Sequence, residues 1–165
     1  MLKQQIQADT TTALKQGDAN VIQVLRMALA SVISKEKERR YKISKDRPDL
    51  AEDVLTKESE LSDELVLEVI INEVKKRRDA IALYEQGKRP ELAEKEKKEI
   101  EILQRYLPTQ LSEEELRKII QESITKTGAK EVKDTGKIMA DLMPKVKGRA
   151  DNVQISKIIK EFLSN

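Results

Sequence analysis

The apolar residues of this chain recur every three or four positions along almost its whole length, which is the spacing of one face of an α-helix. No segment shows the alternation that is typical of a strand. Charged residues make up 38% of the chain, and three tyrosines and one phenylalanine are its only aromatic residues. The pattern and the composition therefore predict an all-α protein.

Glycine, proline and capping residues divide this pattern into separate helices. We expect helices over residues 2–16, from Asp18 into the charged run KEKERRYK, over about 49–58, from Ser62 to Gly87, from Pro90 to Pro108, from Ser112 to Gly128, over 134–146 and over 152–163. The positions predicted to face the core include Ile6, Leu14, Leu25, Ile33, Ile70, Leu103, Leu116, Ile138 and Val153.

The segment LPTQLSEEEL marks a boundary between two units. We predict an amino-terminal helical domain over residues 1–107, followed by a small carboxy-terminal three-helix domain over 108–165. The first of these contains a long charged connection at about 41–61, basic in its first part and acidic in its second.

The chain has no cysteine and no histidine. Thiol chemistry, an imidazole base and the usual zinc and iron sites are therefore excluded. The glycine-rich phosphate-binding motifs and the serine elbow are also absent. We predict no catalytic residue, no metal and no cofactor. There is no apolar run long enough to span a membrane, so we expect a cytoplasmic protein that does not enter a membrane.

The stretch MPKVKGRAD, residues 143–151, has two interpretations. As a helix end, Gly148 would adopt the left-handed conformation, Lys145 and Lys147 would suit the negative end of the helix dipole, and Asp151 would cap the next helix. As a phosphate site, Lys145, Lys147 and Arg149 would surround an exposed backbone near a helix amino terminus. The net charge of only +2 favours local, salt-sensitive binding.

A second basic run, Lys75-Lys76-Arg77-Arg78, lies inside a predicted helix. Four consecutive helical residues spread around the whole circumference, so they cannot all point at one ligand. A solvated face is the favoured interpretation, with Arg77 and Arg78 as secondary candidates for a nucleic-acid contact.

Other charged and aromatic residues have structural interpretations. We expect the glutamates of the helix from Pro90 to pair with lysines of the same helix, and two tyrosines to pack at the edges of the core. These residues are Glu94, Glu96, Glu99 and Glu101, and Tyr84 and Tyr106.

Three stretches coincide with a known family: KKRRDAIALYEQGKRPELAEKEKKEIEILQRYLPTQLSEEEL, GKIMADLMPKVKGRAD and VQISKIIKEFL. Together they resemble the YqeY-like proteins, which are free-standing relatives of the tail domain of the B subunit of glutamine-dependent aspartyl/glutamyl-tRNA amidotransferase. The resemblance departs at about residues 42–60, where the connection is longer than usual.

The resemblance implies a helical domain followed by a three-helix domain that helps to hold tRNA. Residue by residue, it implies nucleic-acid contacts at Lys137, Lys145, Lys147, Gly148 and Arg149. It also links the chain to carbon–nitrogen ligase activity with glutamine as amide donor, although the glutaminase and phosphate-activating residues are not visible in this sequence. We therefore expect an accessory module whose partners are tRNA and an amidotransferase or other protein. Two alternatives stay open, a protein-interaction adaptor with no RNA role and an autonomous amide-forming ligase.

Overall fold

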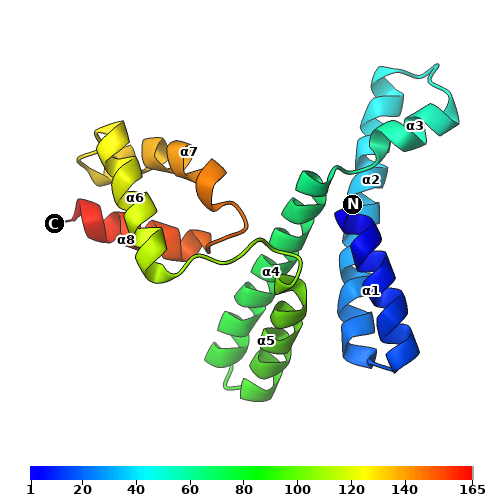
Figure 1. Cartoon of the computed structure of the whole chain (residues 1–165), viewed down its shortest axis with the longest axis horizontal. Coiled ribbons are helices and arrows are strands. Elements are labelled where there is room, and N and C mark those ends of the chain that lie inside the picture. The colour runs from blue at the N-terminus through cyan, green and yellow to red at the C-terminus, as the bar shows by residue number, and fades with distance from the viewer. Residues whose placement is uncertain (165) are drawn as a thin grey trace. The chain divides into compact units, whose positions relative to one another are not determined.

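The computed structural model describes residues 1–164 and contains no strand within them, which confirms the predicted all-α fold (Figure 1). Its helices are α1 (Leu2–Gln16), α2 (Ala19–Asp46), α3 (Glu52–Ser59), α4 (Asp63–Gln86), α5 (Pro90–Gln104), α6 (Glu113–Thr127), the short 3₁₀ helix η1 (Val132–Asp134), α7 (Thr135–Val146) and α8 (Asn152–Leu163). None of the helices described is long and apolar enough to cross a membrane.

The helices form two compact units, Met1–Tyr106 and Leu107–Asn165. Each unit has its own buried apolar side chains, so each is described by itself.

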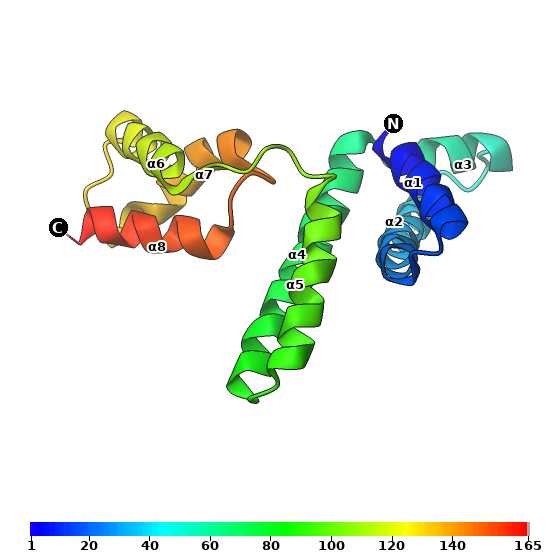
Figure 2. The ribbon, with the colours of Figure 1, turned by 60° about the horizontal axis from the view of Figure 1, so that its bottom comes forward.

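In the amino-terminal unit, α4 and α5 form an antiparallel pair, and α1 packs against α2 (Figure 2). Helix α2 also contacts α4 and α5, so its apolar face connects the two pairs. The side chains that are completely inaccessible in this core are Ile6, Val24, Leu25, Val32, Val66, Ile70 and Leu103.

The charged connection between α2 and α4 folds back on α2 through the short helix α3, which the sequence placed at about 49–58 (Figure 1). Leu55 of α3 and Leu61 after it are buried. Arg40 of α2 and Arg47, which directly follows α2, form ion pairs with Glu52 and Glu58 of α3, respectively. The basic and acidic halves of this connection therefore neutralise part of each other's charge within the chain.

The predicted helix ends are confirmed at several positions. The side chains of Asp18, Ser62 and Ser112 each accept a hydrogen bond from a backbone N–H in the first turn of α2, α4 and α6. Ser112 and Glu115 complete the expected capping box. Gly128 ends α6 with a φ of 65°, a conformation that glycine adopts without steric cost.

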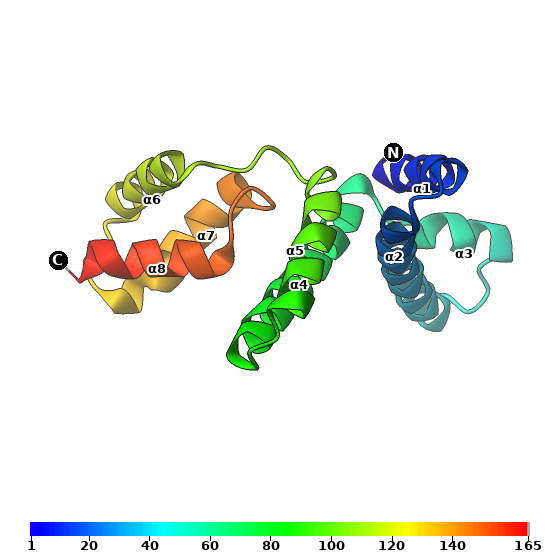
Figure 3. The same ribbon diagram turned by 90° about the horizontal axis from the view of Figure 1, so that it is seen from below.

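The carboxy-terminal unit is a bundle of α6, α7 and α8 (Figure 3). The bundle surrounds one apolar cluster. Its fully inaccessible members are Leu116, Ile120, Ile138, Leu142, Ile155 and Ile159.

Three of the positions predicted to face the core do not do so. Leu14 is 48% exposed, Ile33 is 44% exposed and Val153 is 76% exposed. Each belongs to a predicted apolar stripe, but no other part of residues 1–164 covers its side chain. In α2 the core instead takes Val24, which is completely buried.

Candidate nucleic-acid interface

The basic hinge, residues 145–151, joins α7 to α8 in the carboxy-terminal unit. Helix α7 ends at Val146, whose side chain is buried and anchors the start of the hinge. Gly148 has a φ of 74°, which confirms the left-handed conformation expected for it. Asp151 caps α8, accepting a hydrogen bond from the Val153 N–H at 2.7 Å. The left-handed glycine and the aspartate cap expected of a helix end are therefore present.

The hinge is also held by the segment that precedes α6. The Gln110 side chain donates a hydrogen bond to the Gly148 carbonyl at 2.7 Å, and the Leu111 N–H donates to the Arg149 carbonyl at 2.8 Å. In return, Arg149 Nε donates to the Thr109 carbonyl at 3.2 Å. Three hydrogen bonds thus fix the backbone that carries the cations, and the carbonyls of Gly148 and Arg149 are already occupied.

Lys145 belongs to a polar cluster between α6 and α7. Its Nζ lies 2.7 Å from Asp141 Oδ2 and 3.4 Å from the Ser123 hydroxyl, and Lys126 pairs with the other oxygen of Asp141. The Ser123 hydroxyl donates to Asp141 at 2.9 Å. Hydrogen bonds from Lys126, Lys145 and Ser123 hold the pKa of Asp141 well below its usual range. One carboxylate is thus shared by two lysines, which leaves this cluster with one positive charge.

Lys137 lies about two turns before Lys145 on the same face of α7, because residues 137, 141 and 145 are four apart. The rise of an α-helix separates the Cα atoms of the two lysines by roughly 12 Å. Lys137 pairs with Asp134 at 2.9 Å, and its side chain is 71% exposed. Its hydrogen bond, with those from the backbone of Lys130 and Glu131, lowers the pKa of Asp134. Lys147 and Arg149 are half-buried.

Arg77, a secondary candidate, is not on the surface. It is only 5% exposed and lies in a buried ion network that joins α4 to α5. Its guanidinium donates from Nη1 to Glu73 at 3.0 Å and from Nε to Glu99 at 3.1 Å. The solvated-face interpretation therefore fails at this residue, and the guanidinium is not available to a nucleic acid in this structure. The expectation that Glu99 pairs with a lysine of its own helix is also wrong.

Two acids near Arg77, Glu73 and Glu96, have pKa values that are shifted in opposite directions. Burial alone would raise the pKa of Glu73, but hydrogen bonds from Lys76, Arg77 and Ser31 together outweigh it and lower the pKa. For Glu96, burial and the neighbouring charge of Glu99 raise the pKa, because Arg77 compensates only in part.

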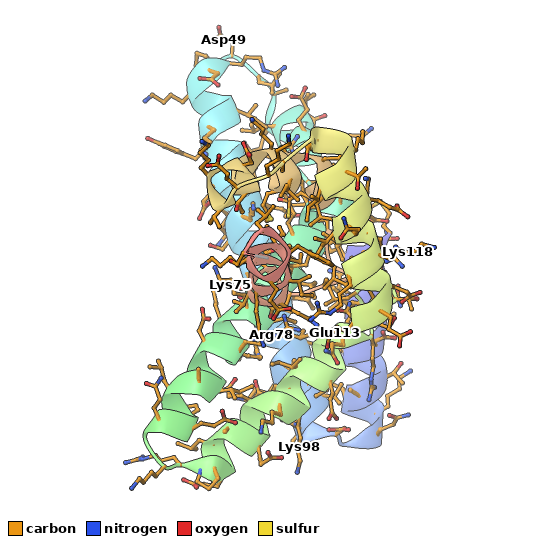
Figure 4. All side chains as sticks on the ribbon, turned by 90° about the vertical axis from the view of Figure 1, so that its left-hand side faces the viewer. Asp49, Lys75, Arg78, Lys98, Glu113 and Lys118 are labelled. Atoms are coloured by element: carbon orange, nitrogen blue, oxygen red, sulfur yellow. The ribbon has the colours of Figure 1, made fainter. Side chains whose placement is uncertain are left out.

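The rest of the second basic run is more accessible than Arg77. Lys75 and Lys76 are exposed and Arg78 is half-buried, and Figure 4 shows Lys75 and Arg78 among the side chains of α4. Tyr106 packs at the core edge as predicted, with its hydroxyl donating to Asp9 at 2.7 Å. Its burial and that hydrogen bond raise the pKa of Tyr106.

An open groove of about 460 Å³ lies between α2 and α4. Its charged lining residues are Lys35, Glu38, Glu73, Lys75, Lys76 and Asp79. Three cations and three acids balance each other, so the groove has no charge preference for an anion.

Sequence reasoning missed Asp141, Ser123 and Lys126. One signal was present, since Asp141 stands four residues before Lys145, a spacing that favours an ion pair on a helix. No sequence signal brings Ser123 and Lys126 of α6 to the same carboxylate, because that contact depends on how α6 packs against α7.

A family model described as "Yqey-like protein" matches residues 3–163. The chain belongs to the YqeY-like family. A search of curated proteins finds no match. The matched residues cover both units, including the connection at 42–60.

Proposed function

We propose that this YqeY-like protein is a cytoplasmic accessory module that binds tRNA, with the hinge of the carboxy-terminal unit contacting the RNA backbone. A partner, such as a glutamine-dependent amidotransferase, would supply the carbon–nitrogen ligase chemistry. The observation that carries the proposal is that the cations at 145–149 stand on a backbone already fixed by Thr109, Gln110 and Leu111. A fixed backbone lowers the entropy lost when the cations meet phosphates.

The charges around the hinge support a phosphate ligand of modest affinity. Lys126 and Lys145 share one carboxylate, and Lys137 extends the same face of α7 toward its amino terminus. A phosphate oxygen can take over part of the contact that Lys126 and Lys145 make with Asp141. Asp141 would then keep the hydrogen bond that it accepts from Ser123. Contacts of this kind position RNA by charge and shape and do not read its bases.

The adaptor alternative relied on the charge-separated connection at 35–64, or on the long helix over 62–86, as the surface that docks another protein. Two arginines of that connection pair with two glutamates of α3, so its charges are partly satisfied inside the chain. No observation favours this connection as a docking surface over the hinge as an RNA contact.

The test is a salt titration of binding to total tRNA. The variant Lys145→Ala/Lys147→Ala/Arg149→Ala should bind more weakly, and each lost phosphate contact should flatten the slope of log K against log salt by roughly 0.9. The matched control is Lys118→Ala/Lys130→Ala/Lys160→Ala, which removes the same charge from exposed positions of the same unit.

The control variant should bind tRNA almost as well as the unaltered protein. Equal losses in the two variants would show that binding follows net charge and not the hinge. An absence of binding by the unaltered protein at low salt would refute the proposal.

A further inference from the structure

Tyr41 is the one tyrosine of this chain that points into solvent. It lies near the carboxyl end of α2 and is 69% exposed, whereas Tyr106 is buried and Tyr84 is half-buried. A single exposed apolar residue is common on protein surfaces and needs no explanation by itself. What distinguishes Tyr41 is the set of residues that surround it.

Lys37 and Lys45 lie four residues before and four residues after Tyr41, so the three side chains share one face of α2. We call this set the Tyr41 face. Both lysines are exposed, and within residues 1–164 neither forms an ion pair. Arg40 and Arg47, by contrast, lie on the side of α2 that meets α3 and are paired with its glutamates.

The charge around the Tyr41 face is positive. Lys42 adds a third exposed cation beside it. Two exposed acids lie near these lysines, Glu38 three residues before Tyr41 and Asp46 four residues after Lys42. Three lysines and two acids leave one positive charge. Glu52 and Glu58 of α3 do not compensate it, because they are already paired with Arg40 and Arg47.

We propose that the Tyr41 face binds a single-stranded nucleic-acid segment, with one base stacked on the Tyr41 ring and flanking phosphates on Lys37 and Lys45. An exposed aromatic ring beside cations is the arrangement that single-strand binders use, because every base has a face that can stack. The Cα atoms of the two lysines are roughly 12 Å apart along the helix, a span of a few nucleotides.

A protein partner fits this surface less well. Ile33 and Met27, the next exposed large apolar residues toward the amino end of α2, lie eight and fourteen positions before Tyr41. The ring is therefore bordered by charge and is not part of a continuous apolar patch of the kind that protein interfaces use.

The test measures binding of a fluorescein-labelled single-stranded oligouridylate to the full chain by anisotropy. Tyr41→Leu should weaken binding roughly tenfold, because leucine keeps an apolar side chain but cannot stack. Tyr41→Phe should bind like the unaltered protein. A duplex of the same length should bind more weakly than the single strand, since its bases are already stacked. Equal affinities for Tyr41→Leu and the unaltered protein, or no binding at low salt, would overturn the proposal.

A matched pair of charge variants tests whether binding depends on the lysines of the Tyr41 face or only on the net charge of the protein. Lys37→Gln/Lys45→Gln should weaken binding several-fold, whereas Lys95→Gln/Lys98→Gln, which removes the same charge from exposed positions of α5, should change it little. Equal losses in the two would refute the assignment of phosphates to Lys37 and Lys45.

Binding at the Tyr41 face can be distinguished from tRNA binding at the hinge. The oligonucleotide should quench tyrosine fluorescence through Tyr41, and the hinge variant Lys145→Ala/Lys147→Ala/Arg149→Ala should keep this quenching because all three tyrosines lie in the other unit. Quenching that persists in Tyr41→Leu would place the bound base elsewhere and overturn the proposal.

Discussion

Two basic runs, Lys75–Arg78 in α4 and Lys145–Arg149 at the carboxyl end of α7 and just beyond it, have different environments in the structure. In α4, Arg77 is turned inward and ties two helices together through Glu73 and Glu99. In the hinge, the cations stand at the outer edge of a bundle whose core is apolar apart from the buried side chain of Ser123. An arginine can be buried in the first case because a neighbouring helix offers carboxylates at that depth, and the core of the second unit offers none.

We expect the largest effect on stability at Arg77. Arg77→Ala should lower the free energy of unfolding of the amino-terminal unit by about 3–5 kcal/mol, because Glu73 and Glu99 would be left as buried charges without this partner. The matched control, Lys75→Ala, should change it by less than about 0.5 kcal/mol, since Lys75 is exposed. Urea denaturation followed by tyrosine fluorescence measures this unit alone, because all three tyrosines belong to it. Equal effects of the two variants would show that the network contributes little.

In the hinge, the backbone should matter more for stability than the cations. Gly148→Ala should destabilise the carboxy-terminal unit by about 1–2 kcal/mol, because the φ of 74° is strained for any residue with a Cβ atom. Gly136→Ala, in the first turn of α7 where an added Cβ meets open space, should instead stabilise it by about 0.5–1 kcal/mol. Urea denaturation followed by circular dichroism compares the two. A loss of stability in both would indicate that α7 tolerates no added side chain, whatever the backbone angle.

Removing the hinge cations should have a smaller effect on stability. Lys145→Ala/Lys147→Ala/Arg149→Ala should change the free energy of unfolding by about 1 kcal/mol, because the Lys145–Asp141 ion pair is partly exposed and Arg149 loses one hydrogen bond to the Thr109 carbonyl. The change should shrink further in high salt, where such pairs are screened. The same denaturation measurement checks this. A loss as large as that expected for Arg77→Ala would mean that the hinge cations are structural and would remove the contrast between the two runs.

We expect the smallest effect on stability from removing the charge of a carboxyl group in the buried network, and this effect should depend on pH. A carboxyl whose pKa is raised by folding favours the folded state at low pH, and that contribution is lost as the pH rises through the folded-state pKa. Glu96→Gln should therefore raise the melting temperature at neutral pH by roughly 1–3 °C, and the gain should vanish below the ordinary carboxyl pKa of 4.5.

Glu73 provides the opposite case. Its pKa is lowered, so its contribution to stability is present above the unfolded-state pKa and is lost as the pH falls through the folded-state value. Glu73→Gln should lower the melting temperature at neutral pH and do so less in acid. Melting curves that show the same pH dependence for both variants would contradict the assigned pKa directions.

Much of the fold followed from local signals in the sequence. Ser112 with Glu115, Gly128 and Asp151 each define a helix end through bonds within a few residues, and the structure confirms all of them. Edge positions such as Ile33 and Val153 were assigned wrongly because periodicity gives the face of a helix but not how far its neighbour extends over it.

The buried network was harder to predict, although the sequence held a signal. Arg77 stands seven residues after Ile70, so it continues the apolar stripe of α4, and Glu99 directly precedes Ile100 on the inner side of α5. A charged residue within an apolar stripe indicates a buried partner. The sequence alone could not identify Glu99 among the several glutamates of α5, because the choice depends on the register between two antiparallel helices.

The bonds from Thr109, Gln110 and Leu111 to the hinge have a mechanical consequence. These three residues stand near the start of the carboxy-terminal unit, just after its first residue Leu107, and they support the basic hinge. Tension carried along the chain from α5 would therefore act first on these hydrogen bonds. The cations of the hinge would then be the first side chains to be displaced.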